Sequence, residues 1–162
     1  MNKSTEVLRI LEEDARTPHE QIAVMAGLPV EEVVRIIKDA EDSGVIARYR
    51  TQVNWEKLGE QQVWALIEVK ITPQRDVGFD AVAERIFNFP ETRDVYLLSG
   101  TYDLAVVVVA KDIYEVSRFV SNRLATIEGV QGTVSHFLLK RYKEDNVILQ
   151  GKAETKRQPL VH

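Results

Sequence analysis

The sequence predicts an α+β protein in which an N-terminal winged helix-turn-helix precedes a C-terminal ferredoxin-like βαββαβ domain. Three observations predict this fold. Apolar residues recur with helical spacing as far as Gly44, residues 45–54 alternate as a strand does, and from Val63 onward the pattern runs strand, helix, strand, strand, helix, strand. We therefore expect a first domain at 1–53, a hinge at 54–62, a second domain at 63–145 and a loose tail at 146–162.

The first domain contains the signals of three short helices. The first helix has an apolar stripe at Val7, Leu8 and Leu11. The second should begin at "TPHE" (17–20), with Thr17 as its N-cap, and stop at Gly27. The third has apolar residues at i, i+3, i+4 and i+7, namely Val30, Val33, Val34 and Ile37. Two short helices joined at a glycine and followed by a strand at 45–54 are typical of a helix-turn-helix with a wing.

The second domain repeats a strand–helix–strand pattern. Its first strand is expected at 63–71, and a helix closed by Pro90 follows it. Strands at 94–100 and 104–110 form a hairpin, a helix capped by Asp112 and broken by Gly129 comes next, and the last strand runs over 133–142. The run "LAVVVVA" (104–110) is apolar on both faces, so we expect helices on one side and a partner subunit's sheet on the other.

Composition excludes several classes of function. The chain has no cysteine and only three dispersed histidines, so disulfides, thiol chemistry and a metal centre are not expected. No apolar run reaches the roughly 18 residues of a membrane helix, and the charged N-terminus does not resemble a signal sequence, so we expect a cytoplasmic protein. The formal net charge is −4, so any DNA binding must depend on local placement of bases.

Four short motifs carry a resemblance to a known family: "GL" at 27–28 before the third helix, "EDSGVI" at 41–46, "SGTYDL" at 99–104 and "GVQGTVSHF" at 129–137. Their order over residues 4–145 resembles the Lrp/AsnC transcriptional regulators. The resemblance implies a protein without catalytic activity that binds double-stranded DNA. It also implies a regulatory domain that pairs with a second subunit, homodimers that assemble into octamers, and no cofactor other than a small effector, an amino acid or a related molecule held between regulatory domains.

The third helix and the following strand supply the candidate DNA-binding residues, which are Glu31, Arg35, Ile36, Lys38, Arg48 and Arg50. Arg35 could donate to guanine, Glu31 could accept from cytosine, and Ile36 could contact a thymine methyl. Lys38, Arg48 and Arg50 could hold phosphates. The alternative is a solvated helix face, because early acids such as Glu31 also complement the helix dipole.

The resemblance places an effector site at the hairpin and the last strand, with candidates Ser99, Gly100, Thr101, Tyr102, Asp103, Thr133 and Ser135. Gly100 would permit a positive φ or a close approach, and Asp103 could accept from a ligand ammonium group. The alternative is a plain hairpin turn in which Asp103 bonds its own backbone.

Two other functions stay open at this level. One is a metabolite-binding oligomeric module with weak or no DNA binding, because residues 1–53 carry seven Lys or Arg against ten Asp or Glu. The other is an enzyme similar to the sirohaem decarboxylases, which resemble this family in fold; chemistry on a tetrapyrrole would need well-placed histidines or arginines.

Overall fold

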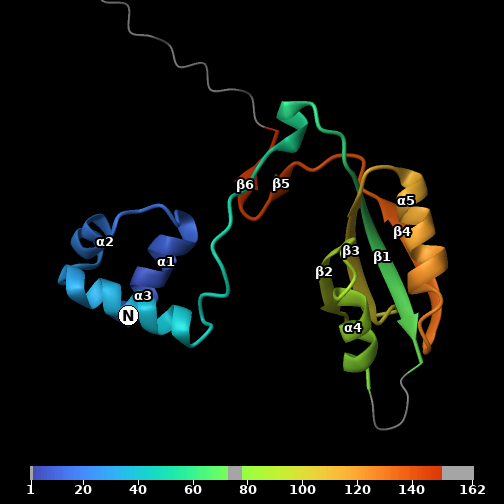
Figure 1. Cartoon of the computed structure of the whole chain (residues 1–162), viewed down its shortest axis with the longest axis horizontal. Helices are drawn as coiled ribbons and strands as arrows, with labels where there is room; N and C mark the ends of the chain where they lie inside the picture. Colours follow the sequence, from blue (N-terminus) through green and yellow to red (C-terminus); the bar gives the residue numbers. More distant parts are fainter. Residues whose placement is uncertain (1, 73–77, 151–162) are drawn as a thin grey trace, which may run out of the picture. The chain divides into compact units, whose positions relative to one another are not determined.

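The computed structural model describes residues 2–72 and 78–150, which belong to two compact units. The first unit comprises residues 1–53 and the second residues 54–162. Figure 1 shows the helices of the first unit in blue and the sheet of the second in green to orange.

The first unit consists of three helices, α1 (Lys3–Glu13), α2 (His19–Ala26) and α3 (Val30–Asp42). Apolar side chains from all three form its core: Val7, Leu11, Ile22, Ala23, Ala26, Val33 and Ile37. Gly27 ends α2 with a φ of 63° and a ψ of 46°, a left-handed conformation that glycine adopts without a steric penalty. The turn between α2 and α3 is therefore the tight connection that the sequence predicts.

The start of α2 differs from the prediction. Thr17 does not cap this helix: Pro18 occupies the cap position without a side-chain hydrogen bond. The Thr17 hydroxyl instead donates to the main-chain oxygen of Asp14 at 2.8 Å, and the Asp14 carboxylate accepts from the amide of Arg16 at 2.9 Å. Asp14 thus organises the turn between α1 and α2, and Thr17 belongs to that turn.

The wing is the second difference, because residues 45–54, which the sequence predicts to be a strand, form none. A strand exists through its ladder of main-chain hydrogen bonds, and among the described residues no segment pairs with this one. Alternation of side chains alone was therefore not sufficient to predict a strand here.

The second unit is built on a four-stranded antiparallel sheet in the order β2-β3-β1-β4. A 3-10 helix, η1 (Trp55–Leu58), opens the unit. The elements of the sheet layer and of the helix layer then follow along the chain: β1 (Val63–Ile71), α4 (Asp80–Phe87), β2 (Thr92–Leu97), β3 (Leu104–Ala110), α5 (Ile113–Phe119), the π-helical turn η2 (Val120–Leu124) and β4 (Val130–Phe137). This order is βαββαβ, so the ferredoxin-like fold is confirmed.

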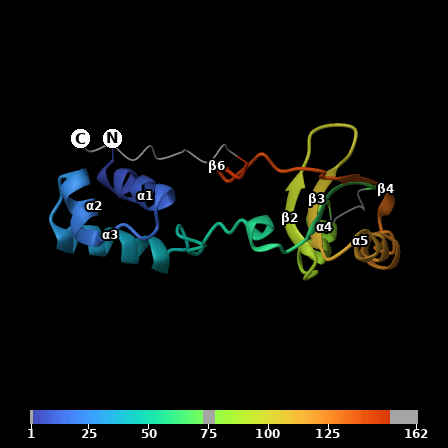
Figure 2. The ribbon, with the colours of Figure 1, turned by 90° about the horizontal axis from the view of Figure 1, so that it is seen from above.

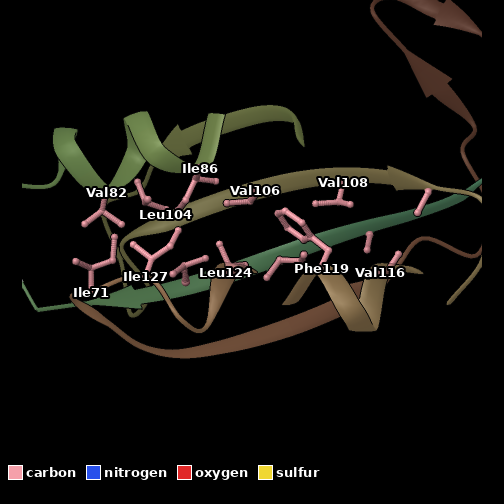
Figure 3. Close-up of a cluster of buried hydrophobic side chains, with 14 residues drawn as sticks. Ile71, Val82, Ile86, Leu104, Val106, Val108, Val116, Phe119, Leu124 and Ile127 are labelled. Carbon is pink, nitrogen blue, oxygen red and sulfur yellow. The ribbon is translucent and has the colours of Figure 1, made fainter. Parts of the chain in front are cut away.

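Helices α4 and α5 cover one face of the sheet, as Figure 2 shows from above. Figure 3 shows the core between them, where Val106 and Val108 of β3 meet Ile86 of α4 and Phe119 of α5. The rings of Phe119 and Phe89 pack edge to face with centroids 5.6 Å apart. Asp112 caps α5 as predicted, accepting from the amide of Glu115 at 2.8 Å.

The segment after β4 departs from the expected loose tail. Residues 143–148 form a small hairpin of β5 (Lys143–Glu144) and β6 (Val147–Ile148), whose turn residues Asp145 and Asn146 have φ of 43° and 65°. Leu149 is buried, and its amide donates to the main-chain oxygen of Tyr142 at 2.9 Å. Residues 146–150 therefore belong to a hydrogen-bonded segment whose buried residue is Leu149, and the rest of the expected tail lies outside the described residues.

Candidate functional site

The exposed face of α3 carries charges of both signs. Glu31, Arg35 and Lys38 are exposed, and the Arg35 side chain is 70% accessible. The Arg35 guanidinium lies 3.7 Å from the Glu32 carboxylate, one turn earlier on the helix. An exposed pair at this distance contributes at most about 1 kcal/mol, so Arg35 can exchange this contact for a stronger acceptor.

Ile36 does not belong to this face, and the expectation that it points outward is wrong. It is half-buried and packs against the core of the first unit, whereas Val34 is 42% exposed. The buried residues of α3 are Val33, Ile37 and Ala40, which centres the apolar stripe between positions 33 and 37. At 100° per residue, this stripe includes position 36 and excludes position 34.

Residues 48–50 follow α3 and hold two of the expected phosphate contacts. Arg48 and Arg50 are exposed, and Arg50 donates to the side-chain oxygen of Gln52 at 3.2 Å. Between them, the Tyr49 hydroxyl donates to the Glu41 carboxylate at 2.8 Å. Burial of Tyr49 is the main cause that raises its pKa, and the hydrogen bond to Glu41 and the charge of Glu41 raise it further. This bond links the segment between the two arginines to the C-terminal end of α3.

The loop 98–103 joins β2 to β3 and contains most of the expected effector residues. Asp103 does not bond its own backbone there. Its carboxylate accepts from the amide of Ile71 at 2.8 Å and forms an ion pair of 3.2 Å with Lys70. The hydrogen bond from Ile71, followed by that from Lys70 and its charge, holds the pKa of Asp103 below its usual value. Asp103 thus ties the loop to the end of β1.

The other loop residues are open to solvent. Ser99, Gly100 and Thr101 are exposed, and Tyr102 is half-buried. Gly100 has no positive φ, and a Cβ added to it would meet nothing within 4 Å, so neither expected reason for this glycine holds within one chain. The loop is available to a ligand or to another chain. The backbone conformation at position 100 does not require a glycine.

The structure brings Thr133 to the same end of the sheet as Asp103. Thr133 stands opposite Val69 in β1, and the Asp103 amide donates to the Val69 oxygen at 3.0 Å. Ser135 lies farther along, opposite Ile67. Both partners face the helix layer, and so do Thr133 and Ser135, because directly paired residues share a face.

No helix within residues 2–72 and 78–150 covers the other face of the sheet, and sequence reasoning missed the charged pair on that face. The imidazole of His136 lies 2.9 Å from the Glu68 carboxylate, and the His136 side chain is half-exposed. Glu68 and Lys70 alternate with the core residues of β1, and this alternation was the signal that places them here. Apolar residues surround the pair on the same face: Leu66, Ala105, Val107, Val109 and Val134.

Neither a metal site nor a membrane span is found in residues 2–72 and 78–150. No group of three or more histidine, cysteine, aspartate or glutamate side chains there could hold a metal ion. Within the same residues no helix has the length and apolar character to cross a bilayer.

Comparison with known proteins identifies the fold and the family. Residues 64–148 match the Lrp/AsnC ligand binding domain. The HTH-type transcriptional regulator YugG of Bacillus subtilis is 47% identical over 156 residues, covering 96% of this chain and 94% of that protein. The HTH-type transcriptional regulator LrpA of Pyrococcus abyssi is 32% identical over 137 residues, covering 85% of this chain and 94% of that protein. Both names describe regulators of transcription and not enzymes.

Solved structures agree with this assignment. The transcriptional regulator NMB0573 of Neisseria meningitidis, in a complex with L-Met, superposes with a TM-score of 0.72 at 25% identity, covering 89% of this chain and 92% of that one. AsnC of E. coli superposes with a TM-score of 0.71 at 21% identity, covering 93% and 98%, which supports the fold. The chain therefore belongs to the Lrp/AsnC family of helix-turn-helix transcriptional regulators.

Proposed function

We propose that this regulator reads double-stranded DNA with Arg35 on α3 and holds the phosphate backbone with Lys38, Arg48 and Arg50. The observation that carries the proposal is the exposure of all four bases on α3 and the segment directly after it. Arg35 has the bidentate geometry that guanine requires, and Glu31 can accept from cytosine. The three remaining bases neutralise phosphates without reading sequence.

The subunits pair through the uncovered face of the sheet. Leu66, Val107 and Val109 are half-buried there, and Val134 is 38% exposed. A sheet face of this composition is stable in water when a second sheet covers it. A homodimer presents two DNA-reading helices, and further assembly to an octamer adds more half-sites, which offsets the acids of α3 through avidity.

A small effector, an amino acid or a similar molecule, binds between the regulatory units of such a dimer. The exposed loop 99–102 supplies hydroxyl and main-chain groups for it. The complex of NMB0573 with L-Met supports an amino-acid effector for this chain as well. The effector changes DNA binding only through its different affinities for the bound and unbound geometries.

The test is binding of the full chain to a fragment from upstream of its own gene, with a scrambled fragment as competitor, over a series of salt concentrations. Preference for the native fragment at physiological salt supports the proposal. Repeating the titration with L-methionine and measuring the molar mass by light scattering tests the effector and the assembly separately.

A second function is favoured by the acids of α3. Glu31, Glu32, Asp39, Glu41 and Asp42 oppose the approach of a polyanion. In that case the chain is a metabolite-binding oligomer with weak DNA binding. Equal affinity for the native and scrambled fragments, lost together as salt rises, would favour this function over sequence reading.

A further inference from the structure

Trp64 is the centre of a charged cluster that sequence reasoning did not detect. The guanidinium of Arg141 lies over its ring with Cζ 4.0 Å from the centroid, and that of Arg93 lies over it at 4.3 Å. Both arginines donate to the carboxylate of Glu144, each at 2.8 Å. Trp64 is 6% exposed and the Arg141 side chain 11%. We call these four residues the Trp64 clamp.

The clamp joins the hairpin β5–β6 to the sheet. Trp64 belongs to β1, Arg93 to β2 and Glu144 to β5. The hydrogen bonds from Arg93 and Arg141 to Glu144 are charge-assisted, and both guanidinium groups also stack on the Trp64 ring. Because a guanidinium is planar, little side-chain entropy is lost for each bond that it forms. The hairpin is therefore held against the sheet by more than its own two-residue strands.

The hairpin segment in turn holds the beginning of the second unit. The Asn54 amide donates to the main-chain oxygen of Leu149 at 3.1 Å, and the Gln150 amide donates to Glu56 at 3.1 Å. Arg141 of the clamp forms a second, longer pair with Glu56 at 3.6 Å. Residues 54–56 are thus attached to the regulatory unit, although the sequence indicates a hinge there.

A second anchor lies only a few residues earlier. The Tyr49–Glu41 hydrogen bond links the Tyr49 side chain to α3, within the first unit. Residues 50–53, between the two anchors, belong to no helix or strand.

We propose that the pivot between the DNA-binding and regulatory units is confined to residues 50–53, and that the Trp64 clamp confines it by holding residues 54–60 on the regulatory unit. Arg141 contacts Glu56 directly, and Glu144 acts on residues 54–60 through Arg141 and through the hairpin β5–β6. The location of the pivot does not depend on the identity of the effector or of the operator.

Hydrogen–deuterium exchange on the full chain tests this location. The amides of Lys57, Gly59 and Glu60 donate to main-chain oxygens of residues 54–56, so they report whether this turn is held. We expect peptide 54–60 to exchange about ten-fold more slowly than peptide 50–53 in the unmodified protein. Glu144→Gln weakens both arginine bonds and should accelerate exchange in 54–60 by about ten-fold, leaving 50–53 unchanged.

The matched control is Glu84→Gln, which neutralises an exposed carboxylate on α4. It should leave both peptides unchanged. Core amides of β1 and β3 serve as an internal reference, because they show whether Glu144→Gln has loosened the whole unit. If only 54–60 accelerates, the clamp is local, as proposed.

Two results would overturn the proposal. One is equal exchange of 50–53 and 54–60 in the unmodified protein, which would place the pivot across the longer segment. The other is an unchanged rate at 54–60 in Glu144→Gln, which would remove the clamp from the pivot. Neither readout requires DNA or effector, so a failure here is distinct from a failure of the proposed DNA binding or effector response.

Discussion

Replacing Arg48 by alanine removes an exposed base that we assign to a phosphate. Lys38, Arg48 and Arg50 on two subunits would neutralise about six phosphates, which gives a slope of log affinity against log salt of about −5. Arg48→Ala leaves about four contacts and a slope of about −4. Between about 50 and 200 mM salt, affinity should then fall about 1,000-fold for the unmodified protein but only about 250-fold for the variant.

The assay is fluorescence anisotropy with labelled native and scrambled fragments at five or more salt concentrations. Because Arg48 is assigned to the backbone, Arg48→Ala should weaken binding to both fragments equally. Arg118→Ala, which removes an exposed base from α5 in the other unit, is the control and should leave the slope unchanged. An unaltered slope in Arg48→Ala, or a loss confined to the native fragment, would refute the assignment.

Three further perturbations test other parts of the structure. Arg35→Ala should weaken binding to the native fragment by about 1–3 kcal/mol and to the scrambled fragment much less, in the same anisotropy assay; equal losses on both would exclude base reading. The contribution of Asp103 to the free energy of unfolding should depend on pH. Because the hydrogen bond from Ile71 lowers its pKa below the unfolded value of 3.8, its contribution is complete above that value and is lost as pH falls through the lowered one. Melting temperatures measured down to about pH 2.5 should therefore fall less steeply in Asp103→Asn, and identical curves would contradict this role. Phe119→Ala should cost about 3–5 kcal/mol in urea unfolding because the ring is buried, whereas the exposed Tyr114→Ala on the same helix should change stability by less than about 0.5 kcal/mol.

Much of the fold was predictable from local signals. Apolar residues at every second position, from Val63 to Ile71, predicted β1 over 63–71, and the apolar run predicted β3 over 104–110, both with the observed bounds. Gly27 and Asp112 marked a helix end and a helix start correctly, because each acts through its own backbone conformation or side-chain bond to nearby residues. These features depend on contacts within a few residues.

The errors concern contacts that a local pattern does not contain. The alternating segment 45–54 lacks a strand to pair with, and Ile36 packs inward because the stripe of α3 is set by the helices that it meets. Both outcomes depend on which neighbour is present. The spacing of apolar residues predicts which side chains of a helix or strand share a face. It does not predict the angle at which that helix or strand packs against its neighbours.

The three helices of the first unit, the βαββαβ order of the second and the candidate bases on α3 were predictable from the sequence, because hydrophobic periodicity, turn residues and short motifs are local properties. Three contacts became visible only in the folded structure: Asp103 binds the end of β1, Glu68 meets His136 on the uncovered face, and Arg93, Arg141 and Glu144 gather around Trp64. These contacting pairs are separated by between 3 and 77 positions along the chain, and most of them meet only when the strands pair in register. Register and docking are collective properties of the folded chain, so the charges that they bring together follow from the structure and not from any single segment.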